Sequence, residues 1–285
     1  MTLSGSIRES VRQAIPRMHL SRADFLASLF IIGCANGLAG KIIASANLRG
    51  WTNAAFGTFD ISVIVVVSCI AGTLLMLRSA GDEVRSGDIA VGVVLFLFMI
   101  LPIAATAWLA VTGLSLYILL LGKMDDSARR GAIILLATTV PMLWSRMLFD
   151  FFAKPILEVD ASLVAWLLGT HRAGNMVEFA DHSGALVIFP PCSSLANVSL
   201  ALLCWVTVSQ FWRHKWRPSD VFWCFLACGS VVAVNVVRIS LMGLSVSHYE
   251  AIHDALGDAI ANTAMTGLTV GISLWAVRGD AISWD

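Results

Sequence analysis

Long apolar stretches, separated by short charged segments, recur along the whole chain of 285 residues. A helix of roughly 20 apolar residues is long enough to cross a hydrocarbon core about 30 Å thick. Eight stretches fit this description: residues 24–44, 59–77, 88–104, 105–122, 131–149, 193–212, 220–243 and 257–277. The third and fourth divide near Pro102, and a single broken helix is the alternative there. The pattern predicts an all-α polytopic membrane protein with about eight transmembrane helices, forming one integral domain over residues 1–285.

One connecting segment, residues 150–192, is longer than the others. From Pro155 to about Gly169 its apolar residues have helical spacing, but the stretch is too short to span, so we expect an interfacial helix. After it, two β-prone runs flank the sequence Asp181-His182-Ser183-Gly184. A glycine-containing turn between such runs predicts a β-hairpin. The segment therefore predicts a helix and hairpin inserted between spans, and long ordered loops of this kind are often functional.

Composition agrees with a membrane protein, because 58% of the residues are hydrophobic and only 13% are charged. Short cytoplasmic loops are enriched in Lys and Arg, and this bias sets orientation. With a cytoplasmic N-terminus, 13 of the 19 Lys and Arg residues fall inside. The other six are Lys41, Arg49, Arg146, Lys154, Arg172 and Arg238. We therefore expect both termini in the cytoplasm and the 150–192 insertion on the outer face. No cleavable signal peptide is evident at the polar, basic N-terminus.

Five of the six cysteines lie within apolar runs, where a thiol behaves as a small hydrophobe. Cys192 is the exception, since it follows Pro190-Pro191 and directly precedes the sixth span. Proline fits well just before a helix. The positive end of a helix dipole stabilises a thiolate, so this position predicts a lowered pKa and a nucleophilic cysteine. A buried structural cysteine is the alternative.

Two further residues fall at the same face by the predicted topology. Arg238 lies late in the seventh span, about 27 Å along from its start near Asp220, close to the outer edge of the core. An arginine within a membrane helix is a functional candidate, with a snorkelling interfacial residue as the alternative. His253 lies just before the last span and suits proton transfer, although His248 is close and competes for that role. A cysteine, a histidine and a fixed cation are the components of thiol acyl transfer.

Other polar residues give weaker indications. Arg146 and Asp150 are four apart and favour a structural pair on one helix face, with substrate contact as the alternative. We assign possible substrate contacts to Arg146, Asn235 and Ser193. No third ligand accompanies Cys224 and Cys228, so we expect no metal site and no cofactor. Signature patterns of P-loop proteins, zinc proteases and serine hydrolases do not occur in the sequence.

These features together resemble the exosortase/archaeosortase family. The resemblance rests on Cys192-Ser193-Ser194-Leu195 at the start of a span, Asn235-Val236-Val237-Arg238 in the next, and His253 four residues before Gly257. It covers roughly residues 150–275, with the motif-bearing helices over 192–275, while the first spans are generic. The family usually has Cys-Ser-Gly-Leu, so Ser194 departs from its pattern and bears on substrate subtype.

The resemblance implies a membrane-embedded cysteine peptidase or transpeptidase of the cytoplasmic membrane, acting at its outer face. Cys192 would be the nucleophile, Arg238 the stabilising cation and His253 the proton carrier. The expected partners are substrate proteins with a C-terminal motif, a transmembrane helix and a basic tail. Membrane lipid, and a lipid or polysaccharide acceptor, would also take part, and nucleic acid would not. One alternative is a non-enzymatic component of a polysaccharide or protein export system. Another is a thiol-redox protein, which a missing second outer cysteine disfavours.

Overall fold

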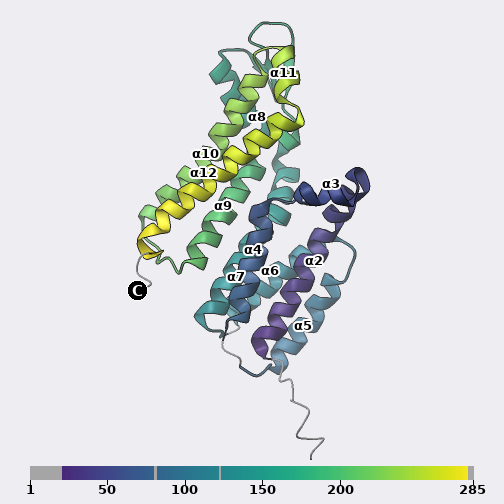
Figure 1. Ribbon diagram of the computed structural model, residues 1–285, viewed down its shortest axis with the longest axis vertical. Helices are drawn as coiled ribbons and strands as arrows, with labels where there is room; N and C mark the ends of the chain where they lie inside the picture. Colours follow the sequence, from purple (N-terminus) through teal and green to yellow (C-terminus); the bar gives the residue numbers. More distant parts are fainter. Residues whose placement is uncertain (1–20, 80–81, 122, 282–285) are drawn as a thin grey trace, which may run out of the picture.

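The computed structural model describes residues 21–79, 82–121 and 123–281, and the basic N-terminal stretch containing Arg8, Arg12 and Arg17 lies outside them. The described chain is mainly helical (Figure 1). Its N-terminal helices are α2 (Arg22–Arg49), α3 (Trp51–Phe56), α4 (Val63–Leu77), α5 (Ser86–Met99), α6 (Ala104–Leu120), α7 (Asp126–Thr139) and α8 (Ser145–Leu168). The later helices are α9 (Ser194–Phe211), α10 (Ser219–Met242), α11 (Val246–Ile252) and α12 (Ala255–Ala281). Single turns η1 (Thr58–Asp60), η2 (Val140–Trp144) and η3 (Pro190–Cys192) connect some of them.

Five helical runs in the described residues are long and apolar enough to cross a membrane. They are Arg22–Arg49, Asp126–Leu168, Ser194–Phe211, Ser219–Met242 and Leu256–Arg278. Three of the predicted spans correspond to the shorter apolar helices α4, α5 and α6. The predicted break near Pro102 is present, because α5 ends at Met99 and α6 begins at Ala104. The helices are compatible with a multi-pass membrane protein.

Helix α8 differs from the expectation of a separate helix beginning near Pro155. It continues α7 through the π-helical turn η2, and the combined run Asp126–Leu168 has 43 residues. At 1.5 Å per residue the run is about 65 Å long, roughly twice the thickness of a hydrocarbon core. Proline lacks the N–H that would bond four residues back, and Pro155 accounts for the kink at Phe152. The predicted span 131–149 and the predicted interfacial helix from Pro155 are thus parts of one continuous, kinked helical run.

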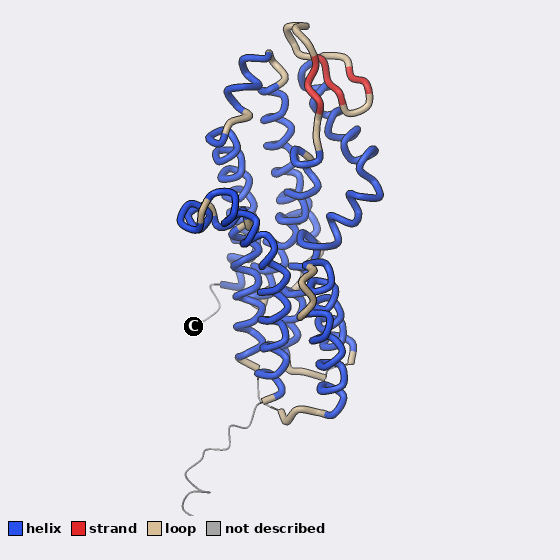
Figure 2. The backbone as a smooth tube through the Cα atoms, turned by 90° about the vertical axis from the view of Figure 1, so that its right-hand side faces the viewer, coloured by secondary structure: helices blue, strands red, loops and turns tan. Residues whose placement is uncertain are grey.

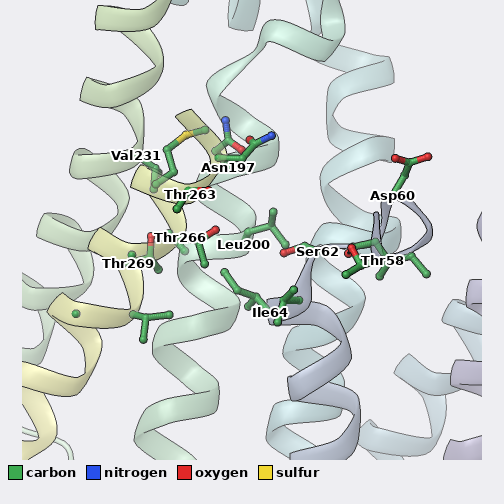
Figure 3. A pocket seen from close by; sticks show the side chains of 18 of the residues that line it. Thr58, Asp60, Ser62, Ile64, Asn197, Leu200, Val231, Thr263, Thr266 and Thr269 are labelled. Carbon is green, nitrogen blue, oxygen red and sulfur yellow. The ribbon is translucent and has the colours of Figure 1, made fainter. Parts of the chain in front are cut away.

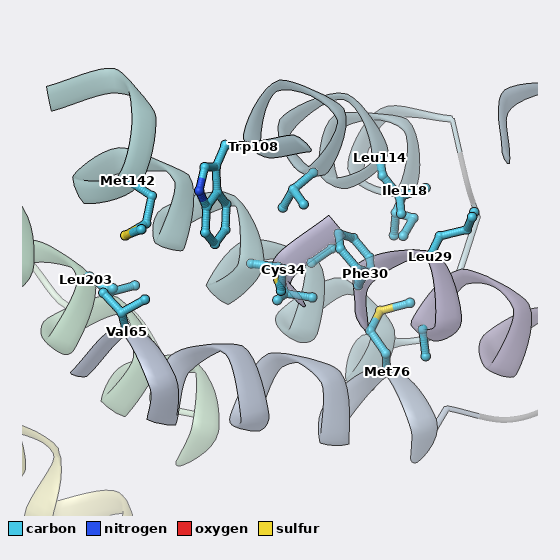
Figure 4. Packing of buried hydrophobic residues seen from close by; sticks show 14 of the residues in the cluster. Leu29, Phe30, Cys34, Val65, Met76, Trp108, Leu114, Ile118, Met142 and Leu203 are labelled. Atoms are coloured by element: carbon cyan, nitrogen blue, oxygen red, sulfur yellow. The ribbon is translucent and has the colours of Figure 1, made fainter. Parts of the chain in front are cut away.

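The N-terminal helices pack around one apolar core, which includes Phe30, Met76 and Trp108 (Figure 4). Glycines let α4 and α7 approach closely, since a Cβ on Gly131 would lie 2.6 Å from the carbonyl oxygen of Gly72. At one end of the bundle, Arg22 on α2 pairs with Asp88 on α5, and both side chains are fully buried. The Tyr117 hydroxyl also donates a hydrogen bond to Asp88 Oδ1, 2.7 Å away. These contacts fix the first helices relative to one another.

The predicted hairpin is present as part of a small antiparallel sheet of order β1-β2-β3 (Figure 2). Its strands are β1 (Arg172–Ala173), β2 (Met176–Glu178) and β3 (Ala185–Val187), and Val177 opposes Leu186. Both of these side chains are buried, in a cluster shared with α8 and α10. The sheet is thus held against the end of α8 that lies far from the N-terminal bundle (Figure 1).

Helix α9 joins the two halves of the molecule, because it contacts α4 and α7 on one side and α10 and α12 on the other (Figure 1). A third apolar cluster, including Ala201, Val231 and Met265, holds α9, α10 and α12 together. The residue immediately before this central helix is the capping Ser193, and Cys192 precedes it.

Candidate active site

Cys192 closes the turn η3, directly before helix α9. The chain arrives extended at Phe189, and Pro190 and Pro191 open the turn. The Cys192 N–H donates to the Phe189 carbonyl oxygen, 2.9 Å away. Ser193 then caps α9, with its Oγ accepting from the Leu195 N–H at 3.3 Å. The expectation that Cys192 directly precedes a helix is confirmed.

Two buried side chains hold the backbone around Cys192. Asn235 on α10, only 1% exposed, donates from Nδ2 to the Cys192 carbonyl oxygen at 2.8 Å and to Ser194 Oγ at 3.1 Å. Asp160 on α8, 3% exposed, accepts from the Ser194 N–H at 3.0 Å. Helices α8, α9 and α10 are thereby tied at the turn that carries the thiol.

Arg238 lies one turn beyond Asn235 on α10 and forms an ion pair with Asp258 on α12. The Arg238 side chain is 14% exposed, whereas that of Asp258 is 49% exposed. The Arg238 Nε is buried and has no hydrogen-bond partner in the part of the chain that the structure describes. An unsatisfied buried donor costs about 1–3 kcal/mol. The guanidinium therefore keeps capacity for an additional acceptor.

The thiol of Cys192 is half-buried, and burial raises its pKa above the ordinary value. The positive charge of Arg238 opposes this shift, while the carboxylates of Asp258 and Asp160 add to it. The expectation of a lowered pKa at this helix start was therefore wrong. Burial and the two acidic neighbours outweigh Arg238 and a backbone hydrogen bond with Phe189, so the pKa of the Cys192 thiol stays above its ordinary value.

The segment between α11 and α12 depends on Gly257. A Cβ at this position would lie 2.1 Å from the carbonyl oxygen of Ile252, so only glycine fits. Asp254 caps α12 by accepting from the Gly257 N–H at 2.8 Å. The next residue, Asp258, is the partner of Arg238. The turn at Gly257 therefore positions the Asp258 carboxylate against Arg238 on α10.

His253 is the C-cap residue of helix α11 and is exposed. Its ring stands edge-on to Tyr249, with 4.9 Å between the ring centroids. Among the described contacts, no hydrogen bond joins the imidazole to Cys192 or Arg238. His248 bonds instead through Nδ1 to Ser245 Oγ, at 2.8 Å. Proton-transfer contacts often form only with substrate bound, so the role of His253 stays a prediction.

The other proposed contact residues fall in different surroundings. Asn235 and Ser193 are buried at the Cys192 turn and support the backbone. Arg146 lies at the start of α8 and lines a pocket that shares no residue with the Cys192 cluster. It forms no ion pair with Asp150 among the described contacts, contrary to the structural pair that their spacing favoured.

Sequence reasoning missed Asp160 and Asp258. Asp160 occupies the apolar face of α8, three residues after Leu157 and one before Ala161, both buried. An acidic residue on the buried face of a helix needs a hydrogen-bond partner, and this pattern in the sequence could have identified Asp160. Asp258 follows Gly257 in the first turn of α12, but its pairing with α10 depends on how the helices cross.

A groove of about 930 Å³ begins close to this site, between α9, α12 and the start of α4 (Figure 3). Asn197 lines it and lies in the first turn of α9, five residues after Cys192. Helix α12 contributes Thr263, Gly267 and Gly271, spaced by four residues along one face. A Cβ on Gly267 or Gly271 would contact nothing within 4 Å. The groove thus has small residues and hydroxyls along an open helix face.

In the described residues, no three His, Cys, Asp or Glu side chains lie together where they could hold a metal ion. Comparisons of the chain with models of protein families, with curated proteins and with solved structures find no match in any of the three.

Proposed function

We propose that this chain is an exosortase-like cysteine peptidase or transpeptidase. It would remove the C-terminal sorting signal of exported proteins at the outer face of the cytoplasmic membrane. The observation that carries the proposal is the cluster at the start of α9. There, Cys192 is held by Asn235 and lies within the electrostatic reach of the partly unsatisfied Arg238. The resemblance of the Cys192, Arg238 and His253 motifs to the exosortase/archaeosortase family supports it.

The proposed chemistry is acyl transfer through a thioester. Cys192 Sγ attacks the carbonyl carbon of the scissile peptide bond, and Arg238 stabilises the negative charge that develops on the carbonyl oxygen. The C–N bond then breaks, the departing amine takes up a proton, and the thioester remains. Water, or an amine or hydroxyl of a lipid or polysaccharide, next attacks the thioester. The C–S bond breaks and the thiol regains its proton.

The raised pKa of Cys192 makes a general base necessary in this scheme. A protonated thiol must lose its proton as it attacks, because the thiolate is the nucleophilic form. Arginine stays protonated and cannot accept that proton. His253 lies five residues before Asp258, which pairs with Arg238 at the start of α12. His253 is therefore the proposed proton carrier.

The proposed substrate includes an apolar helix, which would occupy the groove lined by Asn197, Thr263, Gly267 and Gly271. Small residues spaced by four allow two membrane helices to approach closely. The scissile bond, just outside this helix, would then lie near Cys192. The basic tail would remain on the cytoplasmic side, together with both termini of the chain, as the distribution of Lys and Arg favours.

The deciding experiment uses a tagged protein with a C-terminal apolar helix and basic tail, co-expressed with the full chain. Cys192→Ala should abolish processing and the covalent intermediate that mass spectrometry would otherwise detect on this residue. Cys228→Ala is the matched control, because Cys228 is also half-buried but lies within α10. Unchanged processing by Cys192→Ala would refute the proposal.

The groove can be tested separately from the chemistry. Gly267→Leu fills the open helix face and should slow substrate processing, while alkylation of Cys192 by a small reagent continues. Gly229→Leu is the control, since Gly229 is equally open on α10 but does not line the groove. Equal slowing by both variants would exclude the groove as the helix-binding surface.

A second candidate is a non-enzymatic membrane component of an export system. The observation favouring it is the groove itself, because Asn262, Thr266 and Thr269 give it polar groups well inside α12. Transport sites commonly lie near the middle of the membrane. Under this alternative, Cys192→Ala would leave the cellular phenotype intact while Gly267→Leu would abolish it.

A further inference from the structure

A second pocket, of about 420 Å³, lies between α2, α6 and the start of α8. It contains Lys41 and Arg146, two cations from different helices. Neither forms an ion pair or a hydrogen bond with another described residue. The positive charge of Arg146 acts unfavourably on that of Lys41. Two unpaired like charges at one pocket indicate a site for an anion.

The acidic residues nearby do not neutralise this pair. Asp60 attracts Lys41, but it already pairs with Arg49 at 3.0 Å and accepts from Ser45 Oγ at 2.9 Å. Asp150 lines the pocket and is exposed, without an ion pair to either cation. The pocket itself therefore carries two positive charges against one negative charge.

The remaining wall of the pocket is apolar. Ala44, Ala104 and Met142 contribute to it, together with the buried ring of Trp108. The Trp108 indole is held by a bond from Nε1 to the Gly37 carbonyl oxygen, 3.2 Å away. A Cβ on Gly40 would contact nothing within 4 Å, so the wall is open beside Lys41. An anion bound there would have apolar surface next to it.

The depth of the site separates a lipid from a soluble anion. Lys41 is 19 residues beyond Arg22, the first residue of α2, which is about 28 Å along the helix. This distance is close to the full thickness of a hydrocarbon core of about 30 Å. Lys41 thus lies at the level where phospholipid phosphates meet acyl chains. Soluble ligands would have to compete with lipid at that level.

We propose that Lys41 and Arg146 bind the phosphate of an anionic phospholipid whose acyl chain runs back toward the Arg22 end of α2, against Gly40, Gly37 and Trp108. The site is separate from Cys192 and does not depend on the proposed peptidase activity. The bound lipid would tie α2 to the start of α8. It would also neutralise the repulsion between the two cations.

The test uses the full chain reconstituted in phosphatidylcholine vesicles that contain phosphatidylglycerol, followed by native mass spectrometry of retained lipid. The double variant Lys41→Gln/Arg146→Gln should retain phosphatidylglycerol at least about tenfold more weakly, because charge-assisted contacts are lost. Lys154→Gln, which removes one positive charge from α8 at an exposed position outside the pocket, is the control. Equal retention by the double variant and by Lys154→Gln would overturn the proposal.

A second variant leaves both charges in place. Gly40→Leu should fill the apolar wall and reduce lipid retention, whereas Gly229→Leu, equally open on α10, should not. This comparison decides the matter if the double variant fails to fold. Inorganic phosphate should not displace the retained lipid. Displacement by inorganic phosphate alone would instead establish a soluble-phosphate site and reject the lipid.

Discussion

Asn235 on α10 donates a hydrogen bond from Nδ2 to the carbonyl oxygen of Cys192, 2.8 Å away and 43 residues earlier in the chain. The same amide group also donates to Ser194 Oγ. One buried side chain therefore bonds to the residue before and the residue after the helix cap Ser193. Asn235 begins the motif that ends in Arg238, and the motif therefore combines a backbone support with a cation near the thiol.

Asn235→Ala should loosen the turn that carries Cys192. It leaves a buried carbonyl without its donor, at a cost of about 1–3 kcal/mol in unfolding free energy. Thermal unfolding in detergent measures this loss, and site-specific alkylation should show faster reaction of a more exposed Cys192. Asn53→Ala is the control, since Asn53 is exposed, and it should change stability by less than about 0.5 kcal/mol. Equal effects of the two substitutions would contradict this role.

Asp258→Asn should lower the pKa of Cys192. The carboxylate of Asp258 raises this pKa directly, and it also holds the Arg238 guanidinium that would favour the thiolate. Removing the charge stabilises the thiolate, so alkylation by iodoacetamide should begin at lower pH than in the unmodified protein. The measurement is the rate of modification at Cys192 against pH, resolved by mass spectrometry.

Asp160→Asn should also lower the pKa of Cys192, so alkylation of this residue should begin at a lower pH. Asp160 also raises the pKa of Cys192, and an amide oxygen still accepts from the Ser194 N–H. Asp150→Asn is the matched control on α8, because Asp150 is not among the charges that act on the thiol. A profile unchanged in Asp160→Asn, or shifted equally in Asp150→Asn, would argue against this electrostatic arrangement.

Gly257→Ala should destabilise the start of α12. The new Cβ would meet the Ile252 carbonyl oxygen at 2.1 Å, and relief requires a backbone shift that costs about 1–3 kcal/mol. The shift would displace Asp258 from Arg238, so alkylation of Cys192 should begin at a lower pH. Gly229→Ala has open space in mid-helix and should stabilise by up to about 1 kcal/mol. A stable Gly257→Ala protein with an unaltered profile would refute the close contact.

Ile188→Ala should detach the small sheet from α8 and α10. Ile188 is buried in the cluster that joins them, and truncating such a residue costs about 2–5 kcal/mol. Limited proteolysis should then cut within residues 172–188 before the helices are attacked. Phe189→Ala is the neighbouring control, because that side chain is mostly exposed and should tolerate the change. Protection equal to that of the unmodified protein would contradict the docking.

Several features could be predicted from the amino-acid sequence alone: the helical class, the break near Pro102, the hairpin around Asp181–Gly184 and the position of Cys192 before a helix. These features follow from local rules, because apolar length, proline and turn residues act on neighbouring parts of the chain. The continuity of α7 into α8 escaped the sequence, since a proline can bend a helix as well as end it.

The pKa of the Cys192 thiol depends on contacts between helices that are distant in the sequence. Asp160, Arg238 and Asp258 come from three helices, and their effect on Cys192 depends on how those helices cross. The pKa was predicted to fall because a helix N-terminus is visible in the sequence, whereas burial and distant carboxylates are not. The position of Arg146 also depends on helix packing. Arg146 lines a pocket together with Lys41 of α2, and this pocket does not include Cys192. Local order could be predicted from the sequence, but the charges that meet in space depend on packing between distant segments.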